Sequence, residues 1–312
     1  MKSKHLIPSF LLFLATFPLS AGTLSNGALS LTVRDDNGAI DAIVFNGVDY
    51  FNPGTPVSDF GLQLGTDTST FRCNTTGGSE QIPVSTTTAA GSILAAGTYN
   101  VGTAVTFERS YSLVAGQNAI LITTTFTNAD TNTAALRYFE TFDPDHNPDY
   151  STFNDVYSLG AQSVARATNG AGATFILGST SSVTLAAGGP FMINSGNILN
   201  SFFSSPVDGN GANADSGVHS GYDFSLLPGQ TRTLTTILAF GSTQAAAESA
   251  FNLAGNRPPV VTLNGANPIT LECYVDFYTE YGATAVDPED GPLTLAPIAG
   301  TVDRTHVGTY TR

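Results

Sequence analysis

The acidic segment Glu140–Asp155 contains the residues whose spacing most clearly suggests chemistry. Within it, an oxygen-bearing side chain recurs at every second position: Asp143, Asp145, Asn147 and Asp149. In a tight loop this spacing directs side-chain oxygens inward, as in loops that bind hard cations. Calcium is the expected metal, because every ligand is a hard oxygen and exported proteins meet calcium at high concentration.

This segment also has a second interpretation. It is not an EF-hand, since Pro148 stands where that loop needs a glycine and Asn154 where it needs the closing glutamate. The alternative is a solvated acidic loop in which Asp and Asn side chains cap turns. A second, looser set of oxygen-bearing side chains, for which calcium is also considered, follows later in the chain: Asp208, Asn210 and Asp215.

Other catalytic chemistry has little support in the sequence. The histidines lack paired spacing and there is no CxxC, so zinc is not supported. There is no G-x-S-x-G elbow and no phosphate-binding loop of the P-loop type. Paired carboxylates for glycoside hydrolysis remain open, because their separation is spatial rather than sequential.

Composition sets the fold class and excludes one class of partner. Charged residues make up only 12% of the 312 residues, with 20 Phe, 11 Tyr and many Thr and Ser, a profile that predicts an all-β protein. The formal net charge is −14, and both lysines lie in the first four residues. Such a surface repels phosphate backbones, so we expect no nucleic-acid partner.

The N-terminus has the three-part pattern of a secretory signal. Lys2 and Lys4 precede an apolar run over Leu6–Leu14 and a small-residue segment. Residues 1–21 are therefore predicted to be a signal peptide, with the protein secreted or at the cell surface. No later stretch approaches 18 apolar residues.

Residues 22–255 are predicted to form one large antiparallel β-sandwich, because alternating segments are separated by regular turn signals. Asn37-Gly38 and Asn46-Gly47 are typical of hairpin turns. One helix is expected at Gln244–Leu253, capped by Ser242 or Thr243. The remaining strands are expected at Ala104–Leu113, Ala119–Asn128, Ala135–Phe142, Ala173–Leu177, Ile198–Phe203 and Thr231–Phe240.

The first hairpins, NGALSLTVRDDNGAIDAIVFNGVDYF, resemble the opening of galactose-mutarotase-like β-supersandwiches. The resemblance covers about 30 residues and implies a supersandwich-like fold. Members of that family place a histidine acid and a glutamate base over a sugar ring, so the resemblance makes Glu140, His146 and His219 the candidates for these roles. No recognisable family motif surrounds them, and the favoured interpretation places both histidines in polar surface loops.

Residues 256–312 resemble the bacterial Ig-like repeat named after a pesticidal crystal protein. The matching elements are the Pro-Pro-Val start, Ile269–Glu272, Tyr281–Ala285 and the closing Val307–Tyr310. The resemblance implies a partial, truncated Ig-like β-sandwich after the linker NRPPV, with a spacer or adhesive role. Further Ig-like repeats or an anchor are expected beyond Arg312, and Cys273 is expected to be a free, buried thiol.

The favoured function is therefore a non-catalytic component of a larger bacterial secreted or cell-surface protein, with an adhesive, structural or binding role. Its expected partner is a surface polysaccharide or a protein ligand. The alternative is a carbohydrate-binding or carbohydrate-active supersandwich domain, mutarotase-like or lyase-like. A deep groove lined by Arg109, Arg137, Glu140 or His146 together with aromatic side chains would favour this alternative.

Overall fold

The computed structural model describes residues 22–51, 58–76, 81–146, 150–160, 162–179, 185–209, 211–255, 259–287, 291–295 and 300–310. The predicted signal peptide, with Lys2 and Lys4, lies outside these residues. No helix in the described ranges is long and apolar enough to cross a membrane. The chain divides into two compact units, residues 1–251 and 252–312. The predicted boundary after residue 255 stays a prediction.

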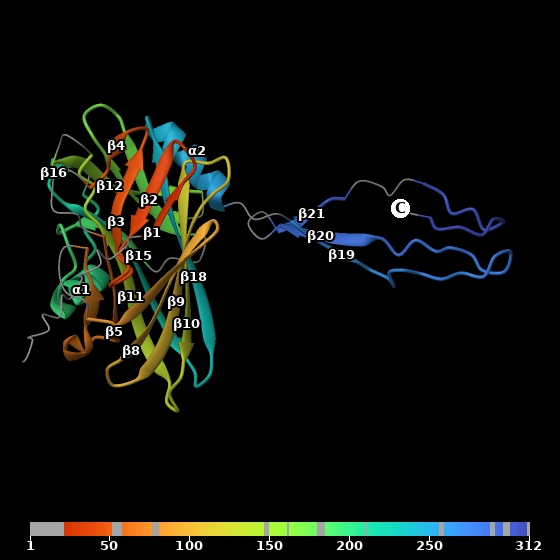
Figure 1. Cartoon of the computed structure of the whole chain (residues 1–312), viewed down its shortest axis with the longest axis horizontal. Helices are drawn as coiled ribbons and strands as arrows, with labels where there is room; N and C mark the ends of the chain where they lie inside the picture. Colours follow the sequence, from red (N-terminus) through yellow and green to blue (C-terminus); the bar gives the residue numbers. More distant parts are fainter. Residues whose placement is uncertain are drawn as a thin grey trace, which may run out of the picture. The chain divides into compact units, whose positions relative to one another are not determined.

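The protein is all-β, and the larger unit is a sandwich of antiparallel sheets (Figure 1). A four-stranded sheet contains β1 (Gly22–Ser25), β2 (Leu29–Val33), β3 (Ile40–Phe45) and β4 (Val48–Asp49), in that order. A nine-stranded sheet has the order β16 (Ala212–Ala214), β12 (Thr152–Leu159), β13 (Gln162–Thr168), β14 (Thr174–Ser179), β18 (Thr231–Gly241), β10 (Ala119–Asn128), β9 (Ala104–Leu113), β8 (Ser92–Asn100) and β7 (Val84–Ala89). A five-stranded sheet has the order β15 (Leu185–Gly189), β17 (Gly217–Leu226), β11 (Ala134–Phe142), β5 (Ser58–Leu64) and β6 (Arg72–Asn74).

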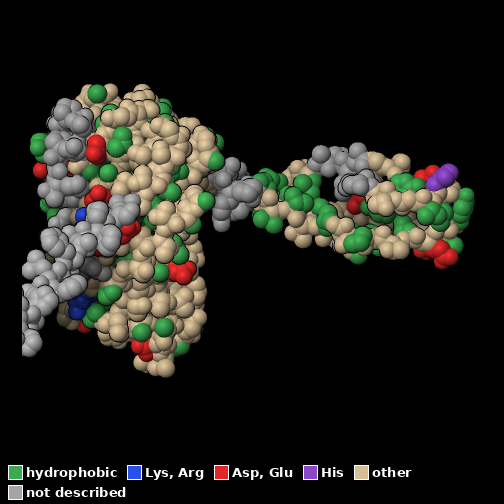
Figure 2. Space-filling view, in the orientation of Figure 1, with side chains coloured by type: hydrophobic (Ala, Val, Ile, Leu, Met, Phe, Trp, Pro, Cys, Tyr) green, Lys and Arg blue, Asp and Glu red, His purple; other side chains and the backbone are tan. Residues whose placement is uncertain are grey.

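Alternation along the strands decides which residues enter the core. In β10, Ile120, Ile122 and Phe126 are buried, while the threonines between them face outward. Apolar side chains of β2 and β3 pack with those of β8, β10, β14 and β18, and β5, β11 and β17 pack with β9 and β10. The visible face of the large unit accordingly carries mostly uncharged polar groups with scattered acidic ones (Figure 2).

The first hairpins form as the sequence indicates. Asn46 and Gly47 both have positive φ, 50° and 79°, as the two central residues of a type I′ turn require. The predicted helix is present as α2 (Gln244–Gly255), and the hydroxyl of Thr243 accepts a hydrogen bond from the backbone N–H of Ala246 at 3.3 Å. Thr243 is therefore its cap.

The predicted strand at Ile198–Phe203 is wrong, because this segment lies in helix α1 (Gly196–Ser204). The Ser195 side chain caps its first turn by accepting from the backbone N–H of Ile198. Leu199 and Phe202, three residues apart, share the buried face of the helix. This face packs on the outer side of the five-stranded sheet, against Phe139 and its neighbours, and Figure 1 shows α1 beside β5, β11 and β15.

The smaller unit contains one three-stranded antiparallel sheet among its described residues, with the order β19 (Val260–Leu263), β20 (Ala283–Asp287) and β21 (Gly291–Leu293). Every side chain of β19 is exposed. Cys273 is half-buried rather than buried, and its thiol donates to the carbonyl oxygen of Arg304 at 3.3 Å. Cys73 in the larger unit is buried, and both cysteines are free thiols.

Candidate functional site

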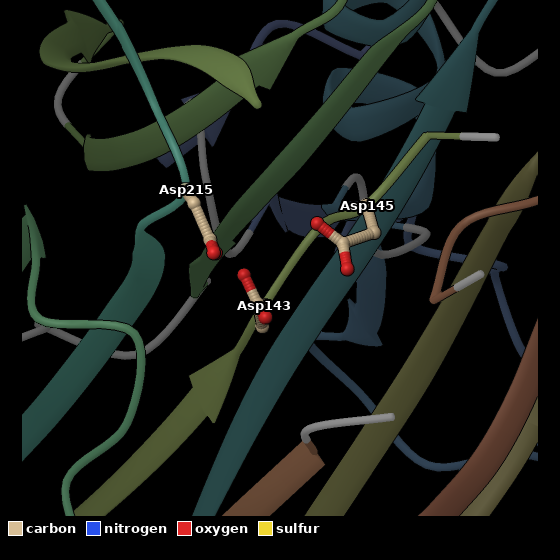
Figure 3. A group of neighbouring side chains, drawn as sticks. All are labelled: Asp143, Asp145 and Asp215. Atoms are coloured by element: carbon tan, nitrogen blue, oxygen red, sulfur yellow. The ribbon is translucent and has the colours of Figure 1, made fainter. Parts of the chain in front are cut away.

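Three carboxylates meet at one end of the five-stranded sheet. Asp143 and Asp145 follow β11, whereas Asp215 precedes β17. One oxygen from each lies within 4.8 Å of the others. Figure 3 shows Asp143 and Asp215 pointing toward each other, with Asp145 beside them. Asp143 and Asp145 are 3% and 2% exposed, and Asp215 is exposed, so the group has a buried side and a solvent side.

Strand pairing explains why residues so far apart in sequence meet here. β11 and β17 are antiparallel, with Phe142 opposite Val218, so the end of β11 lies beside the start of β17. The chain around Asp215 is fixed on both sides. Ala214 pairs with Thr152, and the amide nitrogen of Asn154 donates to the carbonyl oxygen of Ser216 at 2.7 Å. The position of Asp215 is thus held by its neighbours.

A row of buried polar residues crosses the same sheet next to Asp143. Thr141 of β11 pairs with Asp59 of β5 on one side and with His219 of β17 on the other. The Thr141 hydroxyl lies 3.0 Å from Nδ1 of His219. Asp59 and His219 are each 1% exposed.

Burial and mutual repulsion dominate the electrostatics of this region. The pKa of Asp143 is raised to about 8 by burial and by the charges of Asp145, Asp215 and Asp59. Burial raises the pKa of Asp59 to about 7, against a smaller lowering by the backbone N–H of Thr76. Near neutral pH, Asp143 therefore needs either a proton or a neighbouring cation.

The donor set fits a hard divalent cation. The three carboxylates offer only oxygen, which is the chemistry of calcium and magnesium sites. Calcium takes six to eight oxygens in flexible geometry, so water or ligand oxygens would complete the shell on the exposed side of Asp215. On the buried side, the charge of Asp59 lies close enough to contribute to the raised pKa of Asp143.

The sequence-predicted metal ligands fall into three groups. The structure places Asp143 and Asp145 together, whereas Asn147 and Asp149 lie outside the described residues, so the four-residue set stays a prediction. From the second set, Asp215 joins the first cluster. Asp208 is exposed and is not part of it, and Asn210 also lies outside the described residues.

The expectation of histidines in polar surface loops is wrong. His146 is fully buried and contacts Tyr50 with the two rings tilted by 55° and their centroids 4.2 Å apart; burial lowers its pKa to about 3. His219 lies under Phe202 of α1, and burial lowers its pKa to about 4. Both rings are therefore neutral at physiological pH.

Glu140 is likewise buried and is not an accessible acid. It points between the sheets, where Arg109 Nη2 lies 3.3 Å from its Oε2 and the Tyr138 hydroxyl bonds its Oε1. Arg109 and Glu140 are both about 1% exposed. Neither lines a groove. Arg137, on the opposite face of the sheet, bonds Asp223 at 3.0 Å and lies over the ring of Phe203.

Three exposed aromatic residues lie on segments next to Asp215. In the described part of the larger unit, the exposed aromatic residues are Tyr150, Phe153 and Phe191. Phe153 pairs with Asn213, two residues before Asp215, and Tyr150 lies two residues before Thr152 on the same segment. The carbonyl oxygen of Phe191 approaches Gly217, where an added Cβ would lie 2.8 Å from it. All three aromatic residues are therefore on segments adjacent to Asp215.

Comparison of the sequence with known families and proteins assigns the chain to no family. No protein-family model matches the chain, and no curated protein matches it. The resemblance of residues 256–312 to an Ig-like repeat therefore has no such support and stays a prediction.

Solved structures identify the fold of the larger unit. The chain is similar to a bacterial glucoamylase complexed with acarbose, with a TM-score of 0.56 at 12% identity over 74% of this chain and 33% of that one. It thus spans about a third of the glucoamylase. It also aligns with a protein from Escherichia coli K12 named as a putative aldose 1-epimerase. This alignment has a TM-score of 0.47 and 12% identity, and it covers 71% of this chain and 99% of that one. A galactose mutarotase-like protein from Lactobacillus casei aligns at a TM-score of 0.44 and 10% identity over 71% of this chain and 100% of that one. Because the last two TM-scores are below 0.5, the assignment of the β-sandwich fold rests on the glucoamylase.

Proposed function

We propose that the larger unit is a calcium-dependent carbohydrate-binding domain of an exported protein. The observation that carries this proposal is the cluster of Asp143, Asp145 and Asp215, with exposed aromatic residues on the segments next to Asp215. A bound calcium ion coordinates hydroxyls, and aromatic rings pack against the apolar faces of sugars. The fold shared with a glucoamylase solved with acarbose supports a carbohydrate ligand.

Binding rather than catalysis is proposed because the acid–base candidates are enclosed. Glu140 is held by Arg109 inside the sandwich, and His146 and His219 are buried and neutral. A general acid or base must reach the proton that it transfers. The three carboxylates at the sheet end have instead the composition of a metal site.

The proposed role of the chain within a larger protein is supported by two features of the sequence. The signal-like segment over residues 1–21 supports export, where calcium is abundant. The Ig-like resemblance of residues 256–312 supports a spacer that presents the binding domain on a bacterial secreted or surface protein.

A glycan array tests this function. The full chain is applied in calcium, in magnesium and in chelator, and bound protein is measured at each glycan. We expect binding in calcium and its loss in chelator, with less binding in magnesium because it demands a tighter octahedral shell. Asp215→Asn should abolish the binding, whereas Asp208→Asn, an exposed neighbour outside the cluster, should keep it. Binding that is equal in calcium and chelator would contradict the proposal.

A further inference from the structure

We infer that the Asn46-Gly47 turn is a site of covalent self-modification, at which the folded protein loses ammonia and converts Asn46 to aspartate and isoaspartate. This inference is independent of the proposed function. It rests on the hydrogen bonds and the exposure of the asparagines that precede a glycine.

The chemistry needs only this residue pair and water. The backbone nitrogen of Gly47 attacks Cγ of Asn46 and forms the N–Cγ bond of a five-membered imide. The Cγ–Nδ2 bond breaks, and Nδ2 leaves as ammonia with the proton that the Gly47 nitrogen gives up. Water then opens the imide at either carbonyl, which yields aspartate or isoaspartate. Glycine has no Cβ to obstruct the attack, and no described atom lies within 4 Å of a Cβ built at Gly47.

The sequence alone does not single out Asn46, because the chain has six Asn-Gly pairs. One of them, Asn210-Gly211, includes a residue outside the described ranges. The other five are Asn26-Gly27, Asn37-Gly38, Asn46-Gly47, Asn169-Gly170 and Asn264-Gly265. Among these five, only the Asn46 carboxamide makes no hydrogen bond to a described residue, and both Asn46 and Gly47 are exposed.

The Asn37-Gly38 pair shows how the fold prevents the same reaction. Asn37 is 2% exposed, its Oδ1 accepts from the backbone N–H of Ala39, and its Nδ2 donates to the carbonyl oxygen of Thr75, both at 2.9 Å. The attacking nitrogen is also engaged, since the N–H of Gly38 donates to the carbonyl oxygen of Arg34 at 3.0 Å. Both reacting groups of this pair are therefore held.

The remaining three carboxamides are restrained by backbone groups. Asn26 accepts from a backbone N–H at 3.0 Å and donates to a backbone carbonyl oxygen at 3.2 Å. Asn169 accepts from two backbone N–H groups, at 3.0 and 2.9 Å. Asn264 donates to the carbonyl oxygen of Tyr281 at 3.2 Å. Each carboxamide has to give up these bonds before its Cγ can turn toward the next nitrogen.

Ring closure also requires the Asn46 backbone to rotate out of the turn, and the hairpin resists this weakly. β4 has only two residues, both half-buried, and it pairs with β3 through two residue pairs. The N–H of Asn46 donates to the carbonyl oxygen of Ala28 at 2.8 Å, a bond that restrains neither the carboxamide nor the Gly47 nitrogen. Short, exposed turns open locally at a small cost in free energy.

The isoaspartate product does not fit this turn. It places an extra methylene in the main chain, whereas a type I′ turn joins its strands through two residues of defined φ. β4 continues into Tyr50, whose ring contacts His146, and into Phe51, which forms a β-bridge with Asp145. The modified chain should therefore unfold at a lower temperature than the unmodified one.

The test compares the folded chain with the same chain in guanidinium chloride during incubation in mildly alkaline buffer. Tandem mass spectrometry with electron-transfer fragmentation measures aspartate and isoaspartate at the five described sites over time. In denaturant, only the local sequence acts, and Asn37 and Asn46 should react at similar rates. In the folded chain, Asn46 should react at least about tenfold faster than Asn37, because Asn37 reacts only after a larger opening.

Asn46→Gln is the matched variant. Its side chain is one methylene longer, so the ring would have six members and would close much more slowly. Position 46 should then stay unmodified, while the rate at Asn37, which reports on unfolding, should not change.

Two results would overturn the inference. One is an unmodified Asn46 in the folded chain over the period in which the denatured chain reacts fully. The other is faster modification of the folded chain at any of the other four described sites. An isoaspartate-containing fraction that melts at the same temperature as the unmodified protein would contradict the effect on the hairpin.

Discussion

Arg109 and Glu140 join the two main sheets of the larger unit through a fully buried ion pair. Arg109 lies on β9 of the nine-stranded sheet and Glu140 on β11 of the five-stranded sheet, with Nη2 and Oε2 3.3 Å apart. The guanidinium also lies 3.9 Å from the ring centroid of Phe60. The coulombic attraction of Glu140 raises the pKa of Arg109 against the opposing effect of burial. The pair fixes β11, and with it the position of Asp143.

Removing one partner of this pair should destabilise the protein strongly. Glu140→Ala leaves the Arg109 charge buried without its counter-ion, and we expect a loss of about 3 to 5 kcal/mol in the free energy of unfolding. Asp223→Ala breaks the half-exposed Arg137–Asp223 pair and should cost less than about 1 kcal/mol. Urea denaturation followed by circular dichroism measures both. Equal losses in the two variants would contradict the account.

Asp59 predicts a specific pH dependence in the metal-free protein. Its folded-state pKa of about 7 lies above the unfolded value, so the folded state keeps a proton that the unfolded state has lost. The contribution of Asp59 is therefore greatest below about pH 4 and falls as the pH rises to 7. Asp59→Asn removes this fall, and its advantage over the unmutated protein should grow by about 2 to 3 kcal/mol between pH 5 and pH 8.

A surface carboxylate supplies the control of opposite sign. Hydrogen bonds from Ser69 lower the pKa of Asp67, so its contribution is present above the unfolded pKa and is lost as the pH falls through the folded one. Asp67→Asn should therefore show no gain at pH 8. Denaturation in chelator across this pH range measures both variants, and an unchanged pH profile for Asp59→Asn would contradict the raised pKa of the buried Asp59 carboxyl.

The cap of α1 should contribute measurably to stability. Ser195→Ala removes the side chain that accepts from the backbone N–H of Ile198, and we expect a loss of about 1 kcal/mol. Ser204→Ala, at the exposed last position of the same helix, should have less effect. Thermal denaturation of the two variants checks the difference. A larger loss from Ser204→Ala would show that the cap is misassigned.

Much of the fold can be predicted from the sequence, because local rules decide it. Asn46-Gly47 requires positive φ at two positions, and the hairpin between β3 and β4 follows. The alternation in β10 and the cap of α2 are equally local. In contrast, the short apolar run of α1 is compatible with either a strand or a helix, and only Ser195 and the spacing of Leu199 and Phe202 indicate a helix.

The candidate site could be predicted only in part. Asp143 and Asp145 are close in sequence, so their spacing alone identified them. Asp215 joins them because β11 pairs with β17, a contact between segments more than 70 positions apart. The alternation of apolar and polar residues over Tyr222–Leu226 is a signal for that strand, but no spacing rule identifies its partner. The burial of His219 also depends on a contact between segments far apart in sequence, because Phe202 of α1 packs against its ring.

Limited proteolysis tests the predicted boundary after residue 255. Asn256, Arg257 and Pro258 lie outside the described residues, and the sequence there, with consecutive prolines, predicts an extended linker. Subtilisin, a protease of broad specificity, should cut near Arg257 before it cuts within residues 22–255; trypsin is unsuitable because it does not cleave the Arg257–Pro258 bond. Mass spectrometry of the products identifies the site, and a single protected species that spans both units would reject the boundary.

Calcium titration of the metal-free protein tests the central claim most directly. Titration calorimetry on the full chain should show one calcium ion bound per chain, and Asp215→Asn should weaken it at least about tenfold, since one of three carboxylate ligands is lost. Asp208→Asn should bind as the unmutated protein does. Failure of the unmutated protein to bind calcium, or equal affinity in Asp215→Asn, would contradict the assignment of these carboxylates as a calcium site.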